Sequence, residues 1–180
     1  MKVAIIDADL IGRTKHRFPN LACMKLSAYY KSQGNDVHLK TDYNDLNQYD
    51  KVFISKVFTD TLVSDEILAL PNVEYGGTGF FYDKAPKLPD EIEHIMPDYH
   101  LYDEWVNDKL NIDVSDIDNE EEREAILKRK RKDFVYYLDY SIGFLTRGCF
   151  RQCEFCVNKN YKKCEQHSPV HKFMDLLICK

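Results

Sequence analysis

The sequence predicts an α/β fold, in which a Rossmann-like, mostly parallel open sheet is followed by a smaller unit that carries a cluster of cysteines. Two observations in the first half of the chain predict the sheet. Short apolar runs typical of buried strands alternate with helical patterns of apolar residues, and glycine or proline separates many of them. The order is strand, helix, strand, strand, helix, strand, as in open α/β sheets with mostly parallel strands.

The individual elements follow from local patterns. Residues 3–7 form an apolar run that ends in an aspartate, as expected of a strand buried on both faces. Residues 21–33 have apolar side chains at helical spacing, and Gly34 stops this helix. The other elements expected in this half are strands at 36–40, 51–55 and 72–75 and a short helix at 65–70.

Residues 1–102 are assigned to this first domain. Its last part, residues 80–102, is expected to be an ordered loop because three prolines interrupt it. Residues 103–140 are interpreted as a linker. Within this linker, residues 119–132 predict a helix with acids in its first turn and bases in its last, the sense that favours the helix dipole. Residues 134–138 have the apolar and aromatic composition of a strand.

The remaining segment, residues 141–180, is assigned to a second unit. Residues 141–145 are interpreted as a strand that leads into the cysteines. Residues 168–179 predict an amphipathic helix, and the nearby histidines, His167 and His171, are expected to be surface residues.

Ligands of open α/β sheets bind beyond the carboxyl ends of the strands, so the loops after the first and fourth strands are candidate sites. Residues 7–12 follow the first strand but lack the G-x-G-x-x-G spacing, and we therefore expect no dinucleotide. After the fourth strand, Gly76, Gly77 and Gly79 are a candidate cofactor-binding turn, because glycines let backbone amides approach an anion. The alternative is a tight turn without a ligand.

The second unit contains a redox motif. Cys149, Cys153 and Cys156 form a Cys-x3-Cys-x2-Cys triad, and Phe155 stands directly before the third cysteine. Three thiolates on one loop can ligate three of the four irons of a [4Fe–4S] cluster. The fourth iron then lacks a protein ligand, and such an iron can bind a small molecule and pass an electron to it. The triad therefore predicts a metal-cofactor site.

At these residues the chain resembles the radical S-adenosylmethionine (SAM) superfamily, because residues 142–156 look like the first barrel strand and the cluster loop of that family. The resemblance implies that Cys149, Cys153 and Cys156 ligate the cluster, that SAM chelates the open iron and that Phe155 lies near the adenine. It also implies an enzyme that cleaves SAM reductively to the 5′-deoxyadenosyl radical. The partner would be an electron donor such as flavodoxin or ferredoxin, and no motif names the substrate.

The resemblance further implies the start of a (β/α) partial barrel. Full eightfold barrels take about 250 residues, and residues 141–180 suffice for one strand, the cluster loop and one helix. We therefore expect a truncated barrel, or a partner that supplies the rest. The first domain in turn resembles the cobalamin-binding-like domain that precedes the barrel in many radical SAM proteins. The Asp-x-His-x-x-Gly motif of true cobalamin binders is absent from the sequence, so cobalamin is not predicted.

Two alternatives remain open at the cysteines. A cluster held by the same three thiolates can serve electron transfer or sensing without SAM chemistry. Alternatively, Cys164 can complete a four-cysteine zinc site in an interaction module. The usual zinc layouts, two Cys-x2-Cys knuckles or a Cys/His pair on a helix, do not occur in the sequence.

Composition narrows the class of protein. Hydrophobic residues make up 44% of the chain, but they form no long apolar run, so we expect no membrane span. Six cysteines, three of them clustered as ligands, favour a reducing cytoplasm over a disulfide framework. The net charge is −5, yet residues 141–180 carry seven basic and three acidic side chains, which suits an anionic cluster. Because this segment lacks a recognised nucleic-acid motif, we do not expect a nucleic-acid partner.

Overall fold

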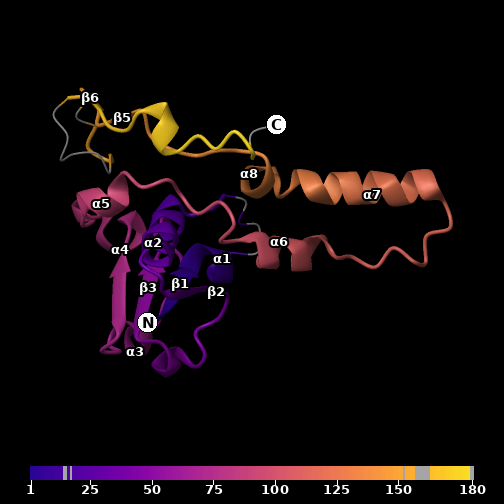
Figure 1. Ribbon diagram of the computed structural model, residues 1–180, viewed down its shortest axis with the longest axis horizontal. Helices are drawn as coiled ribbons and strands as arrows, with labels where there is room; N and C mark the ends of the chain where they lie inside the picture. Colours follow the sequence, from indigo (N-terminus) through magenta and orange to yellow (C-terminus); the bar gives the residue numbers. More distant parts are fainter. Residues whose placement is uncertain (14–15, 17, 152, 157–162, 179–180) are drawn as a thin grey trace.

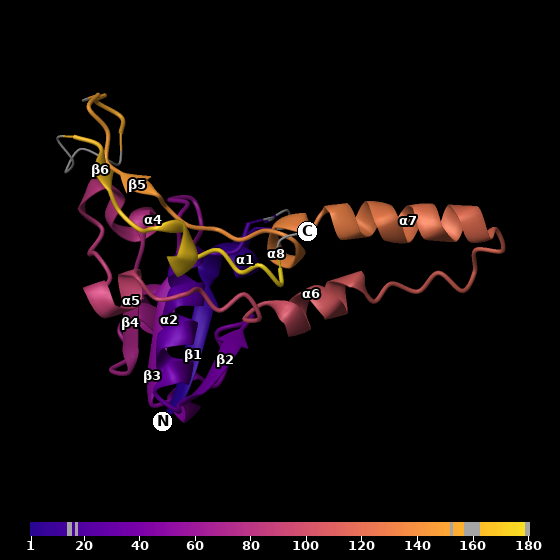
Figure 2. The same cartoon turned by 45° about the horizontal axis from the view of Figure 1, so that its top comes forward.

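The computed structural model describes residues 1–13, 16, 18–151, 153–156 and 163–178. Figure 1 shows a sheet that carries α2 on one face, while β5 and β6 lie beyond α4 and α5. An arm made of α6, a long connection and α7 extends away from the sheet, and the same arrangement is visible after rotation in Figure 2. The chain therefore has one sheet region, one projecting arm and one small cysteine-bearing hairpin.

The sheet has four parallel strands in the order β2-β1-β3-β4. The strands are β1 (Lys2–Asp7), β2 (Asp36–Lys40), β3 (Lys51–Ser55) and β4 (Val73–Gly76). In the register, Ile6 lies opposite Lys40 of β2 and Ile54 of β3, so the carboxyl ends of these strands meet at one edge. The four predicted strands and the parallel α/β sheet are confirmed.

Both faces of the sheet are covered, which explains why β1 is apolar along its length. Val3 and Ile5 face one core, which they share with Phe53 and with residues of α2 (Leu21–Ser32). Ala4 and Ile6 face a second core with Val52 and Ile54, closed by residues around α3 (Asp65–Leu68). Successive side chains of a strand point to opposite faces, so one strand supplies both cores.

The two helices predicted in this half are present. Asn20 caps α2, because its Oδ1 accepts from the backbone N–H groups of Ala22 and Cys23. A further short helix, α1 (Ala8–Gly12), was not predicted and follows β1 directly, with Asp7 as its cap. Residues 80–102, expected to be a loop, contain short helices. These are the end of α4 (Thr78–Phe81), the 3-10 turn η2 (Tyr82–Lys84) and α5 (Asp90–Glu93). Another 3-10 turn, η1 (Leu46–Gln48), lies earlier in the chain, before β3.

Three helices lie within residues 103–140, and they correct one prediction. The charged helix is confirmed as α7 (Glu120–Lys132), which Asn119 caps, and it comes after α6 (Asp103–Leu110). The strand expected at 134–138 is wrong, because these residues form α8 (Val135–Leu138). Phe134 and Tyr137, three residues apart, are both buried in the first core, and helical spacing places them on the same side. None of the helices in the described ranges has the length and apolar character needed to cross a lipid bilayer.

The last segment differs from the expectation in two places. Residues 141–145 are not a strand; the neighbouring β5 (Thr146–Arg147) pairs antiparallel with β6 (Glu165–Gln166). The helix expected at 168–179 is wrong over its described part, which contains only the 3-10 turn η3 (Val170–Lys172). Here the chain is held to the first domain, since the hydroxyl of the buried Tyr99 donates to the backbone carbonyl of Phe173.

Candidate functional site

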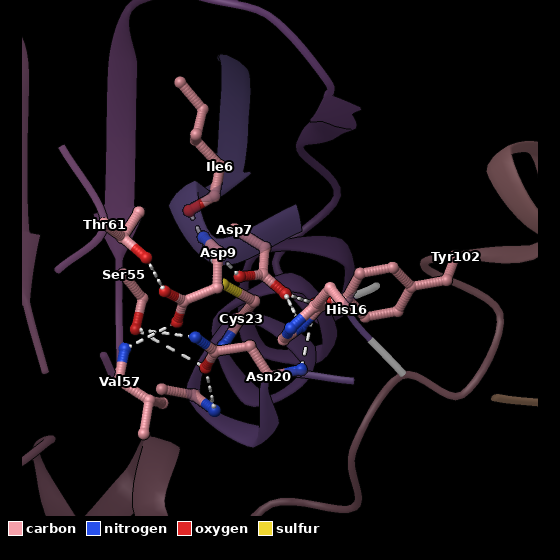
Figure 3. A network of polar contacts seen from close by, with 11 residues as sticks. Ile6, Asp7, Asp9, His16, Asn20, Cys23, Ser55, Val57, Thr61 and Tyr102 are labelled. Carbon is pink, nitrogen blue, oxygen red and sulfur yellow. Dashed lines mark hydrogen bonds and ion pairs between the residues drawn. The ribbon is translucent and has the colours of Figure 1, made fainter. Parts of the chain in front are cut away.

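The carboxyl edge of the sheet holds a buried polar network (Figure 3). β1 ends at Asp7 and β3 at Ser55, and these two residues are register partners in neighbouring strands. The chain leaves β1 toward β2 on one side, while β3 lies on the other, so this is a topological switch point. Open α/β sheets usually bind their ligands at such an edge, so the network lies where a ligand of this sheet would be expected.

Asp9 lies at the centre of this network and is fully buried. Its Oδ2 accepts from the backbone N–H of Val57 at 2.7 Å, and its Oδ1 accepts from the Thr61 hydroxyl at 2.5 Å. Both carboxylate oxygens are therefore used by groups from the segment that follows β3. Asp9 thus fixes the β3 loop to the first turn after β1.

Asp7 is also fully buried, and it connects the sheet edge to the far end of the first domain. Its Oδ2 accepts from the Tyr102 hydroxyl at 2.9 Å, and Tyr102 Oη in turn accepts from the Asn20 backbone N–H at 3.1 Å. His16 Nε2 lies 3.4 Å from the same Asp7 oxygen but makes no hydrogen bond within the described structure. Asn20 Nδ2 completes the network by donating to the Ser55 hydroxyl at 3.1 Å.

The network suppresses acid–base chemistry at its neighbours. Burial raises the pKa of the Cys23 thiol well above its ordinary value, and the charges of Asp7 and Asp9 raise it further. Burial together with Asp7 raises the pKa of Tyr102 in the same way, and burial with both aspartates raises the pKa of Tyr43 to about 12. Cys23 is therefore held as a neutral thiol, which excludes it as a nucleophile or thiolate ligand in this state.

We expect Tyr102→Phe to destabilise the fold. The substitution removes a donor to Asp7 and leaves the Asn20 backbone N–H without its acceptor in a buried site, which costs about 1–3 kcal/mol. Urea unfolding measures this loss. Tyr140→Phe is the matched control, because Tyr140 is exposed and its change should stay within about 0.5 kcal/mol. Equal stability of the two variants would contradict the role of the network.

The glycine-rich turn packs tightly against the end of β3. A β-carbon on Gly77 would lie 2.2 Å from the carbonyl oxygen of Lys56, and Gly77 has φ of 103°, which side chains rarely adopt. A β-carbon on Gly79 would lie 2.6 Å from the carbonyl oxygen of Phe58, and the Gly79 N–H already donates to Lys56 O. Gly76 has open space around it. Close backbone packing therefore accounts for two of the three predicted glycines without a ligand.

The three predicted cluster ligands lie between β5 and β6 in sequence, in a segment that we call the cysteine loop (148–164), of which the structure describes 148–151, 153–156 and 163–164. Cys149, Cys153 and Cys156 are half-buried and free of disulfides. Gly148, with φ of 91°, starts the loop, and the Arg151 N–H donates to Cys149 Sγ at 3.4 Å. Within the described ranges, no three His, Cys, Asp or Glu side chains come close enough together to hold a metal ion. The three thiols and their shared loop suit an iron–sulfur cluster, although in this structure the thiols are not grouped around one point.

The surroundings of the cysteine loop are aromatic and basic. Phe155 is 81% exposed, and its backbone carbonyl accepts from the hydroxyl of Tyr82, which follows α4. Arg151 and Lys163 are basic residues of this loop, and two further lysines, Lys159 and Lys162, fall outside the described residues. Cys164, the alternative zinc ligand, is exposed beside the start of β6.

A second polar cluster lies beneath this loop and is centred on Glu93 of α5. Glu93 Oε1 lies 2.9 Å from Lys25 Nζ, 2.9 Å from Arg147 Nη2 and 2.8 Å from His167 Nε2. Burial alone would raise the pKa of Glu93, but hydrogen bonds from Lys25 and His167 outweigh it and hold this pKa below its usual range. His167 was expected at the surface; its side chain is only 17% exposed, which corrects that prediction, while His171 is exposed as expected.

This cluster predicts a loss of stability in acid. Burial lowers the pKa of His167 from its ordinary 6.5, and contact with Glu93 only partly opposes this. A histidine and a carboxyl with depressed native pKa values both bind more protons when unfolded, so their stability is present above the ordinary values and lost as pH falls through the native ones. We expect the free energy of unfolding to fall below pH 6.5 and again below 4.5.

The measurement is urea unfolding just above and just below the ordinary pKa of histidine. His167→Gln removes this titrating group and also one of the hydrogen bonds that lower the pKa of Glu93, so the difference in pH dependence between the wild type and the variant reports on the His167–Glu93 pair. A variant with the full wild-type pH dependence above 4.5 would contradict the prediction.

Comparisons with protein-family models, curated proteins and solved structures give no match to this chain. Sequence reasoning located the cysteine loop and the glycine turn, but it missed Asp9, Tyr102 and Glu93. For Asp9 a signal existed, because an Asp-x-Asp pair directly follows a buried strand. Tyr102 and Glu93 lie in a segment that was expected to be a loop, and no local pattern marked them.

Proposed function

We propose that this chain is a radical SAM-type iron–sulfur protein that binds a [4Fe–4S] cluster through Cys149, Cys153 and Cys156 for the reductive cleavage of SAM. One observation carries the proposal: the Cys-x3-Cys-x2-Cys triad, with Phe155 before its third cysteine, lies on a single loop between two paired strands. All three thiols are accessible in part and none forms a disulfide. Thiolates on one loop are the ligand type that iron–sulfur clusters require.

Features around the loop support this proposal. The Arg151 N–H donates to Cys149 Sγ, and hydrogen bonds to sulfur are among the means by which proteins tune such clusters. Arg147, Arg151 and Lys163 place positive charge near an anionic cofactor.

The bound cluster would supply one electron to a small molecule at its open iron. The residues of this chain would hold the cluster, neutralise part of its charge and present the exposed Phe155 ring beside the third cysteine of the loop. The proposed setting is the start of a radical SAM partial barrel with a cytoplasmic electron donor. The substrate stays open, because the described residues offer no group that selects one.

Anaerobic reconstitution with iron and sulfide tests the proposal against its alternatives. We expect about four irons and four sulfides per chain, the composition of a [4Fe–4S] cluster, with broad visible absorbance. A colourless protein that takes up zinc and needs Cys164 would instead support the zinc module. A cluster that does not respond to SAM would support the electron-transfer or sensor alternative. Substoichiometric iron with no visible absorbance would overturn cluster binding.

A further inference from the structure

The two ends of the cysteine loop are held by the same carboxylate oxygen. Arg147, at the end of β5, directly precedes the loop, and His167 directly follows β6. Both reach Glu93 Oε1, at 2.9 Å from Arg147 Nη2 and at 2.8 Å from His167 Nε2. Glu93 belongs to α5, which comes from a distant part of the sequence. One side chain of the sheet domain therefore contacts the residues at both ends of the cysteine loop.

The carboxylate at the centre of this contact is largely shielded from water, whereas the Arg147 side chain is 34% exposed. The Glu93 side chain is 13% exposed and that of its third partner, Lys25, is 6% exposed. Lys25 belongs to α2, which packs on the sheet, so the cluster is connected to the first core. Buried ion pairs are screened much less than surface pairs, and removing one partner leaves an uncompensated charge. These ion pairs therefore hold the ends of the cysteine loop in one orientation on the sheet domain.

Other contacts from the same stretch of chain support the same orientation. His94 Nδ1 lies 2.9 Å from the Ser168 hydroxyl, next to His167. Tyr99 Oη accepts from the Ile142 N–H at 2.9 Å, ahead of β5. The Tyr82 hydroxyl donates to the carbonyl of Phe155 within the loop itself. Figures 1 and 2 both show β5 and β6 beside α4 and α5, in agreement with these contacts.

We propose that Glu93 is a positioning residue, which fixes both ends of the cysteine loop on the sheet domain and so sets where the three thiols and Phe155 face. The proposal rests on the proposed function for its purpose, but the clamp itself is a property of the protein without metal. Glu93 touches no candidate ligand directly; it acts through Arg147 and His167. It also balances the charge of Arg147, two residues before Cys149.

Hydrogen–deuterium exchange of the metal-free protein tests the clamp. We expect Glu93→Gln to speed exchange at residues 144–148 and 165–168 by about tenfold or more, with little change in β1 to β4. Glu91→Gln is the matched control, because Glu91 lies in the same short helix and accepts a surface hydrogen bond from Tyr29 at 3.1 Å. Equal exchange at the loop ends in Glu93→Gln and Glu91→Gln would overturn the proposal.

The midpoint potential of the reconstituted cluster is a second measurement, and a purely structural role of Glu93 would leave it unchanged. With iron content unchanged, Glu93→Gln should shift the midpoint potential of the cluster to more positive values, because Arg147 loses its counter-charge. Glu91→Gln should leave the potential unchanged. An unshifted potential in a Glu93→Gln protein with normal iron content would show that Glu93 does not influence the cluster and would overturn the proposal.

Failure of the clamp and failure of the proposed function can be told apart. If the wild type binds no cluster, the proposed function fails, and the exchange measurement still decides whether Glu93 holds the loop. If Glu93→Gln does not fold, Arg147→Gln and His167→Gln each release one end. Each should speed exchange at its own end of the loop, and unchanged exchange in both would overturn the clamp.

Discussion

Cys153→Ala should lose the cluster almost completely, and so should Cys149→Ala and Cys156→Ala. Each variant leaves two thiolates of the triad on the loop, besides Cys164, and among the described residues no three His, Cys, Asp or Glu side chains are grouped so that they could hold a metal ion instead. Outer-shell changes typically cost about 10–100-fold in metal affinity, and loss of a direct ligand should exceed that range. Iron and sulfide content after anaerobic reconstitution, together with visible absorbance, measures the loss.

The remaining cysteines provide the controls. Cys23→Ala should retain the cluster, because Cys23 is fully buried in the core and its thiol is held neutral. Cys179→Ala should also retain it, although Cys179 lies outside the described residues. Cys164→Ala separates iron from zinc, since only a four-cysteine zinc site needs this residue. A full cluster in Cys153→Ala would contradict the ligand assignment.

Gly77→Ala should be the most destabilising of the glycine substitutions in the turn after β4. The new β-carbon would lie 2.2 Å from the carbonyl oxygen of Lys56, and the backbone would have to keep a φ of 103° with a side chain. Backbone strain and overpacking each cost about 1–3 kcal/mol, so the expected loss is about 2–6 kcal/mol. Urea or thermal unfolding measures it.

Gly76→Ala is the matched control for this prediction. Gly76 is the last residue of β4, has open space at its β-carbon position and does not have a positive φ. Its substitution should change stability by less than about 1 kcal/mol. Comparable losses in the two variants would show that the turn is not explained by its packing against β3.

The sheet could be predicted from sequence because its signals are local. Residues 3–7 form a continuous apolar run, since both faces of β1 are buried, and Asn20 and Gly34 mark the limits of α2. The charged helix was recognised for a similar reason, because its acids and bases follow the helix dipole. Such patterns need no knowledge of distant residues.

The wrong elements are those that tertiary contacts decide. Residues 134–138 are rich in aromatic side chains and fit a strand, yet Phe134 and Tyr137 pack around Trp105 in a helical turn. Residues 168–178 have an amphipathic pattern, but Gly143 packs so closely on the Phe173 ring that a β-carbon there would lie 2.1 Å away. Residues 168–178 therefore pack alongside residues 141–143 and do not form the predicted helix.

The candidate site divides in the same way. The cysteines share one loop, so their spacing alone predicted them as ligands. The buried network joins Asp7 to Tyr102, and the loop clamp joins Glu93 to Arg147 and His167. These partners are far apart in sequence, and only the fold brings them together. Local patterns therefore located the proposed cofactor loop but gave no indication of what holds it in place.

The most direct test of the central claim is electron paramagnetic resonance of the reduced, reconstituted protein with and without SAM. A [4Fe–4S] signal that shifts when SAM is added would show an open iron that takes the cofactor, as the proposed function requires. A signal of the same intensity and shape with and without SAM would contradict that function and leave an electron-transfer or sensor protein. No signal, together with bound zinc, would contradict cluster binding itself.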